Sequence, residues 1–182
     1  IMAKKIVVIG GGAAGLMAAL TAGKQEEVYI LEKNERIGKK LFITGKGRCN
    51  VTNAGDADMF FNSVITNSKF MYSSFYSFDN QQVMEFFEKA ACPLKIERGD
   101  RVFPVSDHSS DIIGALKTLI NRNHNIHLML ETIVTSVCTE DGRVTGVTYK
   151  KENENGTSYL ECDAVIVATG GISYPLTGST GD

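Results

Sequence analysis

The 182-residue sequence has no tryptophan, only three prolines and no uninterrupted apolar run of the roughly 18 residues that a membrane-spanning helix needs. It also lacks an excess of basic residues, because 19 lysines and arginines stand against 21 aspartates and glutamates. Without a basic field the chain has little to hold a nucleic-acid backbone. We therefore expect neither nucleic acid nor a membrane among its partners. The hydrophobic share of 43% is typical of a soluble domain, or of part of a larger one.

Cysteine is also scarce, and its spacing excludes two kinds of site. The four cysteines are Cys49, Cys92, Cys138 and Cys162. They form no Cys-x-x-Cys pair and match no zinc pattern, so we expect four reduced thiols in a cytoplasmic protein. The three histidines share no metal-ligand spacing either, and no metal site is predicted.

Two apolar runs with a glycine-rich turn between them predict a β-α-β unit at the start of the chain. Residues 5–9 (KIVVI) and 28–31 (VYIL) are short and largely apolar, as strands buried on both faces are. Residues 13–22 are rich in Ala, Leu and Met and predict a helix, with Gly23 as its C-cap. The whole apolar run from Ile6 to Leu20 could instead be the hydrophobic core of a secretory signal peptide. However, an acidic pair and a second strand follow it, without a small-residue cleavage site.

The rest of the chain predicts a loop, helices and a second group of strands. A Gly-, Lys-, Asn- and Thr-rich loop is expected over 38–55, helical pieces over 56–78, and a helix from Asp79 to 91. A hairpin over 94–97 and 101–105 and a helix capped by Ser109 or Ser110 follow. The strands expected after that are 126–130, 134–139, 143–151, 157–162 and 164–168. The middle three form an antiparallel meander, and the last is apolar throughout.

The sequence GGGAAG, residues 10–15, matches G-x-G-x-x-G directly after a strand and at the start of a helix. In this context Gly10 permits a tight turn, Gly12 lets a pyrophosphate approach the backbone, and Gly15 lets the helix lie close to the strand. Free N–H groups and the helix dipole then face the phosphates. Glu32, about 20 positions later at the end of the second strand, is placed to accept hydrogen bonds from ribose hydroxyls. The turn alone does not distinguish FAD from NAD.

The remaining sequence favours FAD. The meander followed by AVIVATGG resembles the FAD domain of two-dinucleotide-fold flavoproteins. More narrowly, GKKLFITGKGRCNVTN (38–53), ATGGISYPLTGSTGD (168–182) and the glycine turn resemble one bacterial family. That family is the FAD-binding enzymes typed on aminoacetone oxidase, which also include a putative bile-acid reductase.

The resemblance implies an α/β fold: a Rossmann-like FAD-binding domain with a parallel sheet plus a three-stranded antiparallel β-meander. FAD is the implied cofactor. Family members are longer than this chain. Residues 1–182 are therefore expected to be the N-terminal part of one FAD-binding domain, without a substrate-side insert and a returning C-terminal segment.

Carried over residue by residue, the resemblance also implies which residues bind the cofactor. The pyrophosphate would lie against Gly10, Gly12, Ala13, Ala14 and Gly15. The adenosine ribose would be held by Glu32 and Lys33. Lys40 and Leu41 begin a loop that approaches the flavin side with Thr44, Gly45, Gly47, Arg48, Cys49 and Asn50. Val134 would meet adenine through its backbone, and the last strand would end at the cofactor with Thr169, Gly170 and Gly171.

Four features of the 38–78 region carry further expectations. Lys46 stands where the family pattern has glycine, and Arg48 offers a cation to a phosphate or to reduced flavin. Cys49 has no partner cysteine, because Ala54 occupies the position where flavin disulfide reductases have one. No dithiol can form, and Cys49 is expected to pack rather than react. The aromatic residues between 60 and 78 are expected in the core, although part of this stretch could cover a substrate path.

These observations predict that the intact protein is an FAD-dependent oxidoreductase acting on a small molecule or on NAD(P)H. The flavin carries the redox chemistry, so no catalytic acid or base is named. Two alternatives stay open: a non-catalytic module that binds FAD or ADP, and an NAD-only dehydrogenase. A flavoprotein that modifies RNA is a further alternative, and the charge balance disfavours it. The 182-residue chain could be inactive by itself.

Overall fold

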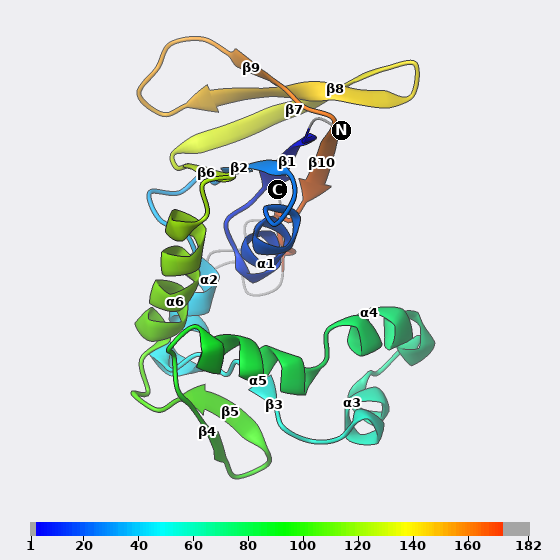
Figure 1. Ribbon diagram of the computed structural model, residues 1–182, viewed down its shortest axis with the longest axis vertical. Coiled ribbons are helices and arrows are strands. Elements are labelled where there is room, and N and C mark those ends of the chain that lie inside the picture. Colours follow the sequence, from blue (N-terminus) through cyan, green and yellow to red (C-terminus); the bar gives the residue numbers. More distant parts are fainter. Residues whose placement is uncertain (1–2, 173–182) are drawn as a thin grey trace. The chain divides into compact units, whose positions relative to one another are not determined.

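The computed structural model describes residues 3–172, which group into two compact units (Figure 1). Unit 1 comes from Ile1–Leu41 and Leu116–Asp182, and unit 2 is Phe42–Ala115. The prediction of one domain over 1–182 stays a prediction. Within residues 3–172, no helix is long and apolar enough to cross a membrane.

Unit 1 is built on a four-stranded parallel sheet. Its elements are β1 (Lys5–Ile9), α1 (Ala13–Ala22), β2 (Glu27–Leu31), β6 (Ile126–Met129) and β10 (Ala164–Val167). The strand order is β10-β1-β2-β6. The chain therefore proceeds outward from β1 and returns on its other side as β10. This makes β1 the point where the strand order reverses, which is where open α/β sheets bind nucleotides.

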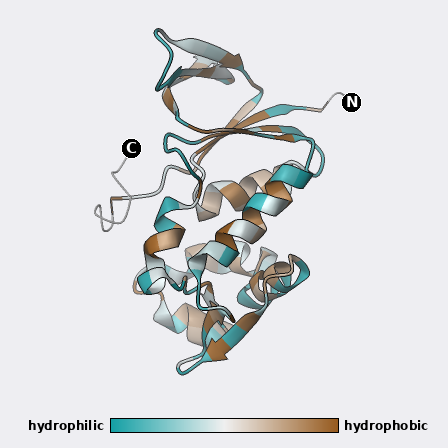
Figure 2. Ribbon diagram, turned by 90° about the vertical axis from the view of Figure 1, so that its left-hand side faces the viewer, coloured by the Kyte–Doolittle hydropathy of each residue, from teal (hydrophilic) through white to brown (hydrophobic). Residues whose placement is uncertain are grey.

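An antiparallel meander covers one face of this sheet (Figure 1). It consists of β7 (Thr132–Glu140), β8 (Arg143–Lys151) and β9 (Ser158–Glu161). Val7 and Leu31 of the sheet pack with Val147 and Cys162 of the meander in one buried cluster. Figure 2 shows hydrophobic and hydrophilic residues along the meander strands, as expected for a layer with one buried face.

The opposite face of the sheet packs against α1. Val8 alternates with the meander-facing residues of β1 and is fully buried, like Leu16 and Ala19 of the helix. Gly23, predicted as a C-cap, has the right-handed φ of −65°, so turn geometry does not require glycine there. Packing requires it, because a Cβ at Gly23 would lie 2.6 Å from Cγ1 of Ile126.

Unit 2 is a small antiparallel sheet with short helices. The sheet has the order β3-β5-β4, from Thr52–Asn53, Arg101–Pro104 and Leu94–Glu97. The helices are α3 (Ala57–Ser63), α4 (Tyr72–Ser77) and α5 (Asn80–Lys89), with 3₁₀ turns at Thr44–Gly47 and Ser68–Met71. Helices α2 (Lys39–Ile43) and α6 (Ser109–Arg122) each include residues of both units. Asp79 caps α5, as the sequence predicts, and forms a reciprocal capping box with Gln82.

The α/β fold, the parallel sheet and the three-stranded meander are confirmed, with two local corrections. Residues 38–55 are not a continuous loop, because they contain α2, a 3₁₀ turn and β3. Helix α6 starts at Ser109 itself, whose hydroxyl donates to the carbonyl of Phe42 at 2.8 Å. A helix of five residues is too short to show a helical period in the sequence, which is why α2 was not predicted.

Candidate cofactor site

The carboxyl ends of β1, β2 and β10 bring the predicted phosphate and ribose residues to one edge of the sheet. The nitrogen of Gly10 donates to the carbonyl of Leu31 at 2.9 Å, which ties the turn after β1 to the end of β2. The nitrogen of Ala168 donates to the carbonyl of Ile9 at 2.9 Å, which ties the end of β10 to the same place. The strand order reverses at this edge, so topology alone marks it as a ligand position.

Two of the three motif glycines are required by the fold itself. Gly10 has φ +107°, and a Cβ there would lie 2.5 Å from the carbonyl oxygen of Ala168. A Cβ at Gly15 would lie 1.9 Å from the carbonyl oxygen of Gly10. These contacts confirm the tight turn and the close approach of helix to strand that the motif predicts.

Gly12 is different, because nothing in the described chain explains why it is glycine. Its φ and ψ of −84° and −172° are open to any residue, and a Cβ there would meet no atom within 4 Å. It is also the N-cap of α1, which has no side-chain cap. The first N–H groups of an α-helix have no intrahelical partner. Open space beside uncapped donors fits the diphosphate of FAD.

Glu32 lies beside this turn and is buried, with 7% of its surface exposed. Its Oε2 atom accepts from the nitrogen of Gly11 at 2.6 Å. Its Oε1 atom accepts from the backbone and side-chain nitrogens of Asn34, at 2.9 Å and 2.5 Å. A carboxylate has about four lone-pair sites, so capacity remains for a ribose hydroxyl.

Sequence reasoning missed the residues that hold Glu32. Asn34 binds its carboxylate, and Nζ of Lys39 in turn donates to Oδ1 of Asn34 at 3.1 Å. Gly11, the unassigned glycine of the triplet, supplies the other donor. An asparagine two residues after a strand-final acid is a turn signal that could have pointed to this contact.

The other predicted residues of unit 1 are distributed as follows. Thr169 lies next to the turn, with its Cα 3.4 Å from the position of a Gly10 Cβ. Val134 lies on β7, whose first residue, Thr132, donates its N–H to the carbonyl of Glu32 at 3.0 Å.

The remaining predicted residues of unit 1 differ in exposure. Ala13 and Ala14 open α1 and are exposed, and the side chains of Lys33, Lys40 and Leu41 are half-buried. Gly170 and Gly171 follow Thr169 and are exposed. Residues 173–182, the end of the 168–182 motif, lie outside the described residues.

The predicted residues of unit 2 form a turn with an unusual backbone. Left-handed φ angles occur at Gly45 (+60°), Lys46 (+57°), Gly47 (+86°) and Cys49 (+59°). Lys46, the departure from the family pattern, thus keeps a conformation that favours glycine. Of the other predicted residues, Thr44 is half-buried and Asn50 is exposed.

Arg48 is held by carboxylates of its own unit. Its Nε donates to Oδ1 of Asp107 at 2.8 Å and its Nη2 to Oε1 of Glu97 at 2.5 Å. Nζ of Lys95 donates to Oδ2 of Asp107 at 2.7 Å. The guanidinium also lies over the ring of Phe103, 4.2 Å from its centre. The expected role of Arg48 as a cation for the cofactor stays a prediction, since its charge is already balanced here.

This four-charge cluster shifts the acids toward ionisation. Hydrogen bonds from Lys95 and then Arg48 hold the pKa of Asp107 below its usual 3.8. The hydrogen bond from Arg48 is the largest influence that lowers the pKa of Glu97 below 4.5. By contrast, burial raises the pKa of the Cys49 thiol, which has 2% of its surface exposed. A neutral, buried thiol matches the expectation that Cys49 packs rather than reacts.

The reversal of strand order, the glycine turn and the buried Glu32 define a Rossmann domain of the dinucleotide-binding class. The family described as "HI0933-like protein Rossmann domain" matches residues 4–182, and the chain belongs to this family. FAD is its cofactor.

Curated proteins of known activity are similar to this chain in sequence. The chain is 31% identical to the 3-dehydro-bile acid delta(4,6)-reductase of Clostridium scindens, over 97% of the chain and 41% of that protein. It is 26% identical to the ribosomal RNA dihydrouridine synthase of Escherichia coli, over 96% of the chain and 41% of that protein. The chain therefore spans about two fifths of the length of these relatives. Because of the second relative, the expectation that no nucleic acid binds stays unconfirmed.

Solved structures share the fold at low sequence identity. The fumarate reductase subunit FrdA of E. coli superposes with a TM-score of 0.71 at 16% identity, over 93% of this chain and 33% of that one. Sdh1 of Mycobacterium smegmatis superposes with a TM-score of 0.70 at 22% identity, over 94% and 34%. At these identities the likeness establishes the fold alone.

Proposed function

We propose that the intact protein is an FAD-dependent oxidoreductase that acts on a small molecule or on NAD(P)H. The observation that carries this proposal is the pairing of the helix start at Gly12, which has no side-chain cap and where a Cβ would meet no atom within 4 Å, with the buried carboxylate of Glu32. Both features lie where β1 ends, at the reversal of the strand order. When bound, FAD supplies hydride and electron transfer.

The residues of this chain would bind and orient the cofactor. The backbone at Gly12 would take the diphosphate, and Glu32 the ribose of the adenosine half. Asn34 and Lys39 would keep the Glu32 carboxylate in place, since they lie behind it in one hydrogen-bonded chain. The main chain of Val134 would face adenine, and Thr169 would close the site beside Gly10.

The intact protein tests this proposal directly. Purified protein is expected to show flavin absorbance, and acid release followed by chromatography should identify FAD. Anaerobic addition of NADH, NADPH or candidate substrates should bleach the flavin absorbance. Bound FAD that dithionite bleaches, but no substrate or nicotinamide does, would support a non-catalytic binding module instead. Release of a nicotinamide nucleotide without FAD would disprove the proposal.

A second candidate is the reduction of uridine in ribosomal RNA. Its support is the 26% and 27% identity to the ribosomal RNA dihydrouridine synthases of E. coli and Haemophilus influenzae. The test is to quantify dihydrouridine by mass spectrometry in ribosomal RNA from cells with and without the gene. Loss of the modified base, restored by the intact gene, would favour this candidate. An unchanged dihydrouridine level would exclude this candidate and favour the oxidoreductase that acts on a small molecule.

A further inference from the structure

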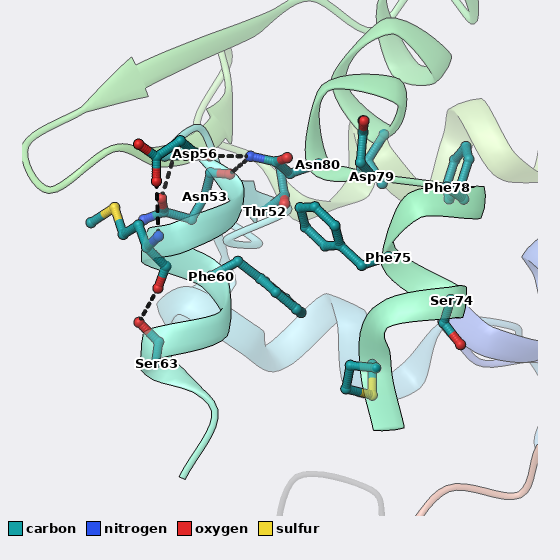
Figure 3. Close-up of a pocket in the computed structure, with 14 residues that line it drawn as sticks. Thr52, Asn53, Asp56, Phe60, Ser63, Ser74, Phe75, Phe78, Asp79 and Asn80 are labelled. Atoms are coloured by element: carbon teal, nitrogen blue, oxygen red, sulfur yellow. Dashed lines mark hydrogen bonds between the residues drawn. The ribbon is translucent and has the colours of Figure 1, made fainter. Parts of the chain in front are cut away.

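Unit 2 contains a pocket of about 550 Å³ that plays no part in the cofactor site described above (Figure 3). It lies between α3, α4 and the start of α5, with β3 at one side. The residues that carry the argument are Asp56, Phe60, Phe75, Phe78, Asp79 and Asn80. Binding pockets for small ligands typically have volumes of about 300–1,000 Å³ and mainly apolar walls.

Aromatic rings form one wall of this pocket. Phe60 and Phe75 are stacked, with ring centres 4.4 Å apart and an interplanar angle of 28°. In Figure 3 these two rings lie next to each other, Phe60 on α3 and Phe75 on α4. Phe78 adds a third ring that is 42% exposed, so apolar surface remains available to a ligand.

A fixed polar group lies beside the aromatic wall. Nδ2 of Asn80 donates to the carbonyl oxygens of Asn53 and Gly55, at 2.7 Å each. These two bonds orient the amide and join the start of α5 to the chain between β3 and α3. The polar side of the pocket is therefore held in place before any ligand binds, which lowers the entropic cost of binding.

The charge around the pocket is negative. Asp56 and Asp79 line it, and none of its described lining residues is basic. Each carboxylate already caps a helix: Asp56 accepts from the nitrogen of Met59 and Asp79 from that of Gln82, both at 2.8 Å. Each carboxylate thus occupies one N–H group at its helix start, and the negative charge of both acids disfavours an anion.

We propose that this pocket is a binding site for a neutral, ring-bearing apolar small molecule. The stacked rings favour a flat hydrophobic group, the volume fits a single small ligand, and the two capping acids disfavour an anion. The site lies wholly within unit 2, and the proposal does not depend on the oxidoreductase function. Binding at the pocket and loading of FAD are separate measurements, so the failure of one is distinguishable from the failure of the other.

A pair of probes with the same rings tests both the site and its charge preference. Calorimetric titrations of the intact flavoprotein would compare neutral N-phenylnaphthylamine with its sulfonated counterpart, anilinonaphthalene sulfonate. We expect saturable one-to-one binding of the neutral probe and about tenfold weaker binding of the sulfonate, because the carboxylates of Asp56 and Asp79 repel a like charge. Absence of saturable binding by the neutral probe, or equal or tighter binding of the sulfonate, would overturn the proposal.

Substitutions then locate the bound probe. Phe78→Ala should weaken binding of the neutral probe roughly three- to tenfold through the loss of one ring contact. The matched control is Phe70→Ala, a 77% exposed ring that is not among the lining residues, and it should leave affinity unchanged. Removing both charges with Asp56→Asn and Asp79→Asn, which keep the helix caps, should bring the two probes to similar affinity. Equal effects of Phe78→Ala and Phe70→Ala, or an unchanged ratio in the double variant, would contradict the assignment.

Discussion

The Oε2 atom of Glu32 lies 2.6 Å from the backbone nitrogen of Gly11, so this buried acid is anchored to the glycine turn itself. A buried carboxylate is costly unless it is hydrogen-bonded, and here three N–H groups satisfy it. The acid is therefore held at the turn by the protein's own donors, independently of a ligand. If Glu32 binds the ribose and the turn binds the diphosphate, as proposed above, this hydrogen bond joins the two parts of the site.

Replacing the acid should weaken the cofactor's adenosine end. Glu32→Gln keeps the shape but removes the charge, and it sets an amide N–H₂ against N–H donors of Gly11 or Asn34. We expect FAD to bind the intact apoprotein roughly ten- to hundredfold more weakly, since a hydrogen bond to a charged group contributes about 1.5–3 kcal/mol. Titration of the apoprotein with FAD, followed by flavin fluorescence, measures the change.

The matched control is Glu35→Gln, which alters an exposed acid in the same segment that pairs with Arg36 at 3.5 Å. Its affinity for FAD should equal that of the unsubstituted protein, because an exposed ion pair contributes little. Equal affinities of Glu32→Gln and the unsubstituted protein would argue against the ribose role.

Alanine at two glycines of the turn should separate folding from binding. Gly15→Ala places a Cβ 1.9 Å from a backbone oxygen and should lower the free energy of unfolding by about 1–3 kcal/mol or more. Gly12→Ala meets no atom within 4 Å and should change it by less than about 1 kcal/mol. Its new methyl group nevertheless occupies the space assigned to the diphosphate, so FAD binding should fall sharply.

Urea unfolding of the two variants, compared with their FAD titrations, measures this difference. A Gly12→Ala variant that folds normally and binds FAD with full affinity would show that the diphosphate lies elsewhere. A Gly15→Ala variant as stable as the parent would instead question the close approach of α1 to β1.

Local signals made the secondary structure around the glycine turn predictable, and long-range contacts account for what was missed. The strand, turn and helix from Lys5 to Ala22 follow from residues that are neighbours in sequence, and their bounds are confirmed. The partners of Arg48 could not be inferred, since Glu97 and Asp107 are 49 and 59 residues away in sequence. No periodic pattern encodes such a contact.

The charge cluster around Arg48 should make unit 2 sensitive to acid. Both carboxylates have pKa values lowered in the folded state, so the unfolded chain binds protons more readily. Their stabilising contribution is present above the ordinary values of 4.5 for Glu97 and 3.8 for Asp107, and it is lost as pH falls through the lower folded values. Urea unfolding midpoints should therefore decline across this acidic window.

Glu97→Gln and Asp107→Asn should flatten this decline, because an amide does not titrate. The control is Glu85→Gln, which removes an exposed acid that pairs with Lys89 at 3.0 Å, and its pH profile should follow that of the parent. A parent profile that stays flat through this acidic window would contradict the prediction. So would a decline of the same steepness in Glu97→Gln and Asp107→Asn.

The thiols should differ in reactivity according to burial. Cys49, Cys92 and Cys162 have 2%, 4% and 4% of their surface exposed, and burial raises the pKa of each thiol. Cys138 is less buried. Since the thiolate is the reactive form, Cys138 should be modified first by a disulfide reagent at mildly alkaline pH, and the other three only after unfolding. Cys138→Ser should remove the fast phase. Rapid modification of Cys49 in that folded variant would instead indicate an accessible, reactive thiol in the turn that contains Arg48.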